Sequence, residues 1–351
     1  MDQYTTSTFQ QRYPEHQYTS TYNNYGDVQQ PARAAPVDDD KYHHKSGANS
    51  THSLLTQAKR SLGQPNFLRK NKGHMIAYCG LALLVLSVYH LLSDGDFSFM
   101  LTLGGITRSV GFAHLAFNIV RSRSAAGISL QTLQLYAVTF AARLCSVLTS
   151  DGYLPYDASG DWFYQANEVV GFLLVLLNIY LVSTAFKGSY EPQHDSFGVS
   201  AMFPAVGRHG ALAFLAAPAL ALALVFHPSL NNFLPTDIAW AVALYLESVA
   251  VIPQLFHFQR KGGEIQSSTA HYVFTFGLSR LFIFAFWVSS AHELNDSAAQ
   301  GVHAGWTGSV VLLMQVVHLV LMGDYSYYYA KALMHSIKTG AAMVLPTTSM
   351  V

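Results

Sequence analysis

Charged residues are scarce in this sequence. Only 11% of its 351 residues are charged, whereas 51% belong to the hydrophobic set. Soluble domains carry about a quarter charged residues, so this deficit favours a membrane protein. Neither sign is in excess, because 20 basic residues balance 20 acidic ones. The composition therefore predicts no affinity for nucleic acid.

Cysteines and catalytic motifs are also nearly absent. Cys79 and Cys145 are the only cysteines, and both lie in apolar segments, where a thiol usually acts as a small buried hydrophobe. The sequence has no His-Glu-x-x-His, no Gly-x-Ser-x-Gly, no phosphate-binding loop and no cysteine pair at metal-ligand spacing. We therefore predict that the protein is not an enzyme and uses no cofactor or metal.

Long apolar runs dominate the rest of the chain. A helix needs about 20 mostly apolar residues to cross a bilayer core. Eight segments meet this requirement, at residues 74–93, 98–119, 131–150, 163–186, 208–227, 236–257, 271–291 and 306–330. Residues 1–73 are polar and contain no such run, so we expect a disordered tail there.

The connections between these segments alternate in charge. One set carries Arg and Lys, and the other carries acidic residues with no Arg or Lys. Basic loops lie on the cytoplasmic side of a membrane. The alternation holds through all eight segments and predicts that both termini are cytoplasmic.

Two segments resemble each other. Tyr136-Ala-Val-Thr-Phe-Ala-Ala-Arg143-Leu144 matches Tyr272-Val-Phe-Thr-Phe-Gly-Leu-Ser-Arg280-Leu281 with one inserted residue. Both segments are predicted to cross in the same direction, which indicates parallel repeats with a cavity between them. Segments two to four and six to eight would then form two triple-helix units, with 208–227 as the linker. A chance match of aromatic-rich helices is the alternative.

Ionisable residues inside apolar segments mark a candidate site, because each is costly in lipid and is usually functional. Arg108, Arg143 and Arg280 fall within three different segments, and Glu168 and Glu247 within two others. A guanidinium in a low-dielectric cavity suits a carboxylate, which it can bind through two parallel hydrogen bonds. The alternative is that the arginines and glutamates pair with one another and have a structural role.

A second group lies near the predicted luminal end of segment 236–257. Asp237 and Trp240 are about one helical turn apart and share a face. This pair is suited to a cationic or imidazole side chain of the same ligand.

Several sequence blocks resemble the endoplasmic reticulum (ER) lumen protein retaining receptors, also called KDEL receptors. They are Ser122–Ser129, Tyr190–Phe197, Tyr245–Leu255, His271-Tyr272 and the run that begins at Asp324, and the similarity covers roughly residues 98–331. Pro253-Gln254 is similar to the Pro-Gln signature that relates this family to SWEET sugar transporters. The resemblance implies an all-α membrane protein with a seven-helix SWEET-like, PQ-loop bundle. The additional first segment makes the chain most similar to a plant-type receptor-like branch.

The resemblance also implies a site. Arg143, Trp240 and Trp287 match the family's ligand-binding residues, and Asp237 stands where the family has Glu. Glu247 matches a family glutamate, and Arg108 stands at the position of the family's pH-sensing histidine.

Other family positions are replaced. These replacements are Leu101 for an arginine, Ser146 for an aspartate, Ser279 for a tyrosine and Ser290 for an arginine. Losing a buried charge partner costs about 2–5 kcal/mol in binding. We therefore expect tight binding only if Arg108 or Arg280 compensates, with Glu247 in support.

These observations predict a receptor for the C-terminal Lys/His-Asp-Glu-Leu signals of luminal proteins, in the membranes of the ER and Golgi. The expected partners are these signal peptides, membrane lipid and the coat proteins of retrograde vesicles. The predicted parts are a cytoplasmic tail (1–73), an extra transmembrane helix (74–95), a receptor-like domain (96–331) and a cytoplasmic C-terminal tail (332–351). The alternatives are a SWEET-like transporter of small solutes and a trafficking factor that binds no retention signal.

Overall fold

A computed structural model describes residue 83, residues 99–149, 161–197, 210–229, 233–265, 267–297 and 305–339, and residues 343, 345 and 346. All of them belong to the compact unit Lys59–Val351. The predicted tail 1–73 and, apart from Leu83, the predicted extra helix 74–95 lie outside the described residues. The predicted sidedness of the termini stays a prediction.

The described residues are almost entirely helical. The long helices are α4 (Phe99–Ser122), α5 (Leu130–Val147), α6 (Asp161–Tyr180), α7 (Gly210–Val225), α8 (Leu234–Val249), α9 (Ile252–Lys261), α10 (Ser267–Ser297) and α11 (Thr307–Thr339). A π-helical turn, η3 (Leu181–Ala185), extends α6, and a short 3-10 helix, η4 (Lys187–Ser189), follows it. β1 (Glu264–Ile265) pairs antiparallel with β2 (Leu345–Pro346). Each of the seven predicted segments from residue 98 onward contains a helix, so the all-α prediction is confirmed.

Length and hydropathy identify four membrane-crossing candidates among the described residues. They are Trp162–Ala185, Leu234–Lys261, Thr269–His292 and Thr307–Thr339. Large apolar side chains also point away from the bundle, among them Phe117 and Val320, which are 60% and 71% exposed. Apolar side chains on the outside are expected where lipid surrounds a protein.

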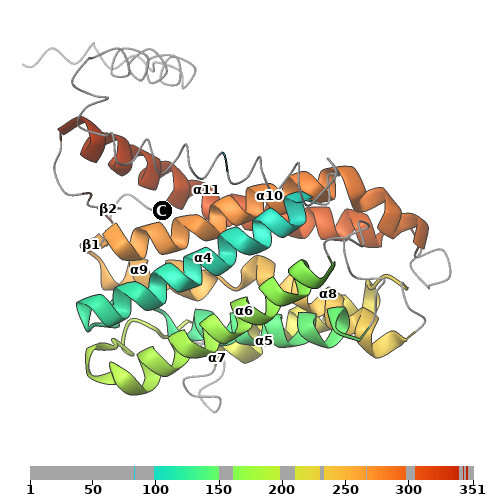
Figure 1. Cartoon of the computed structure of the whole chain (residues 1–351), viewed down its shortest axis with the longest axis horizontal. Helices are drawn as coiled ribbons and strands as arrows, with labels where there is room; N and C mark the ends of the chain where they lie inside the picture. The colour runs from blue at the N-terminus through green and yellow to red at the C-terminus, as the bar shows by residue number, and fades with distance from the viewer. Residues whose placement is uncertain are drawn as a thin grey trace, which may run out of the picture. The chain divides into compact units, whose positions relative to one another are not determined.

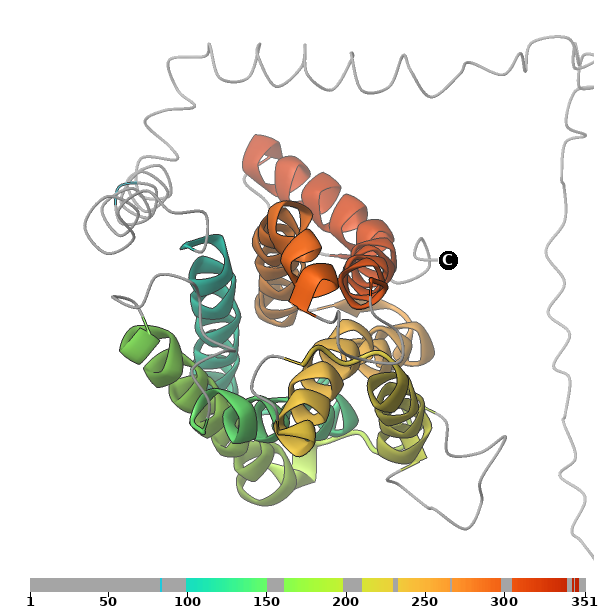
Figure 2. The same cartoon turned by 90° about the vertical axis from the view of Figure 1, so that its right-hand side faces the viewer.

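The helices form two groups of three. Figure 1 shows them side by side, and Figure 2 shows α4, α6 and α5 grouped apart from α8, α11 and α10. Within the first group α6 packs against both α4 and α5, and within the second α11 packs against both α8 and α10. Between the groups α4 contacts α10 and α5 contacts α8. This pattern is the one that two parallel repeats produce, and α7, which packs on α8, is the linker.

The repeated tyrosines lie at the interface of the two groups. Tyr136 of α5 and Tyr272 of α10 both approach Phe112, with ring centroids 5.2 and 6.3 Å away. Phe276 closes this aromatic cluster at 4.9 Å from Phe112. The two tyrosines that begin the repeated motif therefore lie in one aromatic cluster, where the two helix groups meet.

Small residues let α4 and α10 approach closely. A Cβ atom on Gly104 would lie 3.0 Å from the carbonyl oxygen of Ser279 and would also meet the side chain of Ile283. The Ser279 hydroxyl donates a hydrogen bond of 2.7 Å to the Gly104 carbonyl oxygen. Ser279 therefore joins the two helix groups where α4 and α10 pack closely.

The loop blocks that resemble the family meet at one end of the bundle. Gln254, of the Pro-Gln signature, accepts from the Ser129 backbone N–H at 2.8 Å and donates to the Gly127 carbonyl at 2.9 Å. Asp195 accepts from the Ser129 hydroxyl at 2.6 Å and from the Leu130 N–H at 2.7 Å. The first backbone N–H groups of a helix have no carbonyl acceptor within the helix, and Gln254 and Asp195 accept from those at the start of α5.

Glu191 holds the same end of the bundle to α9. Its carboxylate accepts from Lys261 Nζ at 2.8 Å and from the Gly127 backbone N–H at 3.0 Å. Partial burial alone would raise the pKa of Glu191, but these two donors outweigh it and lower the pKa below its usual value. The loop block Tyr190–Phe197 therefore joins the first helix group to α9.

We expect Gly104→Ala to lower the free energy of unfolding by about 1–3 kcal/mol, because the added methyl group overlaps Ser279 and Ile283. Thermal melting of the detergent-purified protein measures this. Gly188→Ala is the matched control, since a Cβ atom there meets nothing within 4 Å. Equal melting temperatures for both variants would contradict the close packing of α4 on α10.

Candidate functional site

Five ionisable residues from five helices converge in the interior of the bundle. We call them the charge cluster: Arg108 of α4, Arg143 of α5, Glu168 of α6, Glu247 of α8 and Arg280 of α10. None is more than 5% exposed. The helices carry these residues in otherwise apolar sequences, so only a fold that brings the helices together can compensate their charges.

Glu247 is the centre of the charge cluster. Its Oε1 accepts a hydrogen bond from Arg108, and its Oε2 accepts one from Arg143. The Nη2 of Arg280 lies 2.7 Å from Oε1 of Glu247 as an ion pair. One carboxylate therefore joins α8 to three other helices in both groups.

Glu168 and Gln315 accept hydrogen bonds from different arginines of the cluster. The Oε1 of Glu168 accepts from Arg108 Nη2 at 2.6 Å and lies 3.7 Å from Arg143 Nη1. At the other end, Arg280 Nη1 donates to Oε1 of Gln315, on α11, at 3.2 Å. The guanidinium of Arg108 also lies over the Phe140 ring, 4.5 Å from its centroid.

The charges of this cluster do not cancel. Among the residues that the structure describes, three guanidinium groups face two carboxylates, which leaves one positive charge in excess. Uncompensated charge in a low-dielectric interior is costly, and an anion that entered the cluster would remove this cost. The arginines and glutamates therefore pair with one another, as the structural alternative in the sequence analysis predicted. This pairing compensates only part of the positive charge.

The aromatic pair lies on two of the same helices. Trp240 of α8 and Trp287 of α10 meet edge to face, with ring centroids 5.8 Å apart. Both rings are buried, as is Asp237, which is one turn from Trp240. The indole N–H of Trp287 has no hydrogen-bond partner among the described residues. The structure thus brings Trp240 and Trp287 together, on the helices that also carry Glu247 and Arg280.

Two buried serines have packing roles. The Ser146 hydroxyl donates to the Thr236 carbonyl oxygen at 2.8 Å and so joins α5 to α8. Ser279 makes the equivalent contact between α10 and α4. Neither hydroxyl contacts the charge cluster in the bonds described, whereas Arg108 and Arg280 both pair with Glu247.

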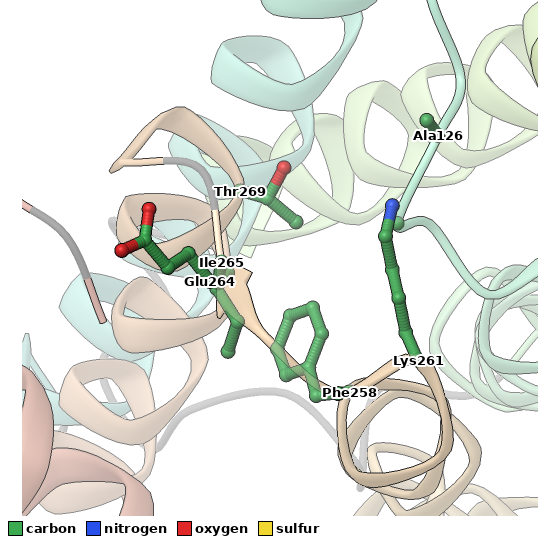
Figure 3. Close-up of a pocket in the computed structure, with 8 residues that line it drawn as sticks. Ala126, Phe258, Lys261, Glu264, Ile265 and Thr269 are labelled. Atoms are coloured by element: carbon green, nitrogen blue, oxygen red, sulfur yellow. The ribbon is translucent and has the colours of Figure 1, made fainter. Parts of the chain in front are cut away.

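A small cavity lies at the connection between α9 and α10 (Figure 3). Its volume is about 70 Å³, and its lining includes Phe258, Lys261 and Thr269. Lys261 already donates to Glu191, and the cavity shares no residue with the charge cluster. It is therefore separate from the candidate site.

Gln315 was not predicted from the sequence. It is buried, and with His318 it places two polar side chains within the apolar run of α11. Their spacing of three residues puts them on one helix face, which is the signal that could have identified them.

We expect Glu247→Gln to destabilise the protein by about 3–5 kcal/mol, because it leaves three buried arginines with one carboxylate. Thermal melting in detergent measures the effect, with the exposed Glu264→Gln as control. A melting temperature equal to that of the control would show that Glu247 does not hold the cluster together.

Comparison with known proteins identifies relatives of this chain. Residues 124–290 match the family described as ER lumen protein retaining receptor. The chain is 31% identical to ER lumen protein-retaining receptor 2 of Gallus gallus over 226 residues, which is 64% of this chain and 90% of the relative. It is 29% identical to receptor 2 of Homo sapiens over 226 residues, again 64% and 90% of the two chains. The ER lumen protein-retaining receptor of Dictyostelium discoideum is 26% identical over 237 residues, 66% of this chain and 91% of the relative.

The matched residues include Arg143, Glu168, Glu247 and Arg280 of the charge cluster. They also include the loop blocks that meet at the start of α5. On this evidence the chain belongs to the ER lumen protein retaining receptor family, an all-α membrane protein family of the ER and Golgi system.

Proposed function

We propose that this protein is a receptor that binds C-terminal Lys/His-Asp-Glu-Leu signals from the luminal side and returns soluble proteins from the Golgi to the ER. The observation that carries this proposal is the excess positive charge of the buried cluster. The names of the relatives, which are ER lumen protein-retaining receptors, support it.

The chemistry of the cluster favours a carboxylate as the bound group. A guanidinium donates two parallel hydrogen bonds that fix both the position and the orientation of a carboxylate. In a buried site this interaction is stronger than in water. A peptide that ends in a free carboxylate supplies one negative charge, which equals the excess of the cluster.

The remaining predicted residues would select the side chains of the signal. Asp237 next to Trp240 offers a carboxylate and an aromatic ring to a cationic or imidazole side chain. Trp287 offers its unpartnered indole N–H and an aromatic wall. In this proposal Arg143 anchors the carboxylate. Arg108 and Arg280 support or replace Arg143, and Glu247 supports the arginines.

The proposal includes a membrane arrangement. Both termini are cytoplasmic, residues 1–73 form a tail, residues 74–95 an extra transmembrane helix, and residues 96–331 the receptor domain. The C-terminal residues 332–351 begin within α11, which continues to Thr339. Coat proteins of retrograde vesicles are the proposed cytoplasmic partners.

Labelled peptides ending in His-Asp-Glu-Leu or Lys-Asp-Glu-Leu should bind the purified protein saturably at about pH 5.5 and pH 7.4. We expect Arg143→Ala to weaken binding by at least about tenfold, because it removes a charged donor. Trp287→Phe keeps the aromatic wall and removes the N–H, so we expect a smaller loss. A thermal melt of each variant distinguishes lost binding from lost folding.

Absence of binding by the wild-type protein at both pH values would reject the proposal. Uptake of a small solute into proteoliposomes would then support the transporter alternative. Loss of cellular function on deletion of residues 1–73, together with full function of Arg143→Ala, would support the trafficking factor.

A further inference from the structure

Gln315 occupies a special place in the charge cluster. Its side chain is 1% exposed, and its Oε1 accepts the hydrogen bond from Arg280. An arginine only donates, so this bond fixes the orientation of the amide and directs Oε1 at Arg280. The amide nitrogen, Nε2, is buried and has no partner among the described residues.

In the internal repeat, the residue that corresponds to Gln315 of α11 is Glu168 of α6. Arg143 and Arg280 are equivalent in the two helix groups, and α6 and α11 are the equivalent third helices. Arg143 has Glu168 of α6 beside it, whereas Arg280 has Gln315 of α11. The first group therefore has a carboxylate where the second has a neutral amide, and a carboxylate at the position of Gln315 would balance the three arginines.

Arg280 is the least compensated arginine of the cluster. Arg108 and Arg143 each lie near both glutamates, but among the described residues Arg280 pairs with Glu247 alone. The Nη2 of Arg280 is 2.7 Å from Oε1 of Glu247, yet the geometry does not make a directed hydrogen bond. Gln315 Nε2 is thus a donor without an acceptor among the described residues, beside an Arg280 whose ion pair with Glu247 is poorly directed.

His318 limits where an anion can lie. Its Nδ1 bonds the Ser248 carbonyl oxygen at 2.7 Å, so this nitrogen carries the proton and the buried Nε2 is an acceptor. An anionic oxygen is itself an acceptor, so it forms no hydrogen bond with Nε2 of His318. The donors of Arg280 and Gln315 are therefore the better neighbours for an anion in the second helix group.

We propose that Gln315 is a ligand-binding residue that determines the anion preference of this site. Its neutral side chain leaves Arg280 available, and its Nε2 donates a hydrogen bond to an anionic oxygen held beside Arg280. This inference rests on the proposed function, since the anion is the C-terminal carboxylate of the retention signal. It places that carboxylate toward α10 and α11, rather than at Arg143 alone.

The test replaces Gln315 with a side chain of the same shape that carries a negative charge. Gln315→Glu adds a carboxylate next to Arg280 and brings the cluster to three positive and three negative charges. We expect it to weaken binding of a labelled peptide ending in His-Asp-Glu-Leu by at least about a hundredfold. We also expect its melting temperature to rise, because the added carboxylate compensates a buried charge.

Two further variants complete the test. Gln259→Glu makes the same chemical change at an exposed position of α9 and should alter neither binding nor melting. Gln315→Leu removes the Nε2 donor together with the Oε1 that accepts from Arg280, and it should weaken binding at least roughly tenfold, as expected for the loss of one hydrogen bond to a charged group.

The outcomes separate this inference from the proposed function. If the wild-type protein binds and Gln315→Glu binds within threefold of it, or loses binding together with stability, the inference is wrong. If the wild-type protein binds no peptide, the proposed function is rejected. The melting temperatures then still test whether the cluster has an uncompensated positive charge beside Gln315. A melting temperature of Gln315→Glu above that of Gln259→Glu supports this charge excess, and a lower one overturns it.

Discussion

The interaction of Glu247 with three arginines is the one on which the rest of the structure depends. Arg108, Arg143 and Arg280 come from α4, α5 and α10, and Glu247 is the one carboxylate of the charge cluster that pairs with all three in the apolar interior. The single carboxylate therefore fixes how the two helix groups meet. It also fixes where the remaining positive charge lies.

Close packing and polar loops support this interaction from both sides. Gly104 and Ser279 bring α4 onto α10 near the cluster, and Ser146 joins α5 to α8. At one end of the bundle Asp195 and Gln254 satisfy the start of α5, which carries Arg143. The site is thus held by contacts between helices that are far apart in the sequence, so that local segments alone cannot form it.

Much of this arrangement could be predicted from the sequence. Arg108, Arg143, Arg280, Glu168 and Glu247 stand out because each interrupts an apolar run, and their cost in lipid makes them informative. The repeat was visible because Tyr136 and Tyr272 begin the same motif. The partners of each charge could not be predicted, because pairing depends on the rotation and depth of each helix. Gln315 could not be predicted because a neutral amide costs less than a charge in an apolar helix and is therefore a weaker signal in the sequence.

The central claim is that the excess positive charge of the buried cluster binds a carboxylate. Calorimetric titration of the wild-type protein with two peptides tests it most directly. Both end in His-Asp-Glu-Leu, one with a free C-terminal carboxylate and the other with a C-terminal carboxamide of nearly the same shape. The account predicts that the carboxylate form binds at least about a hundredfold more tightly. Equal affinities for the two peptides would contradict it.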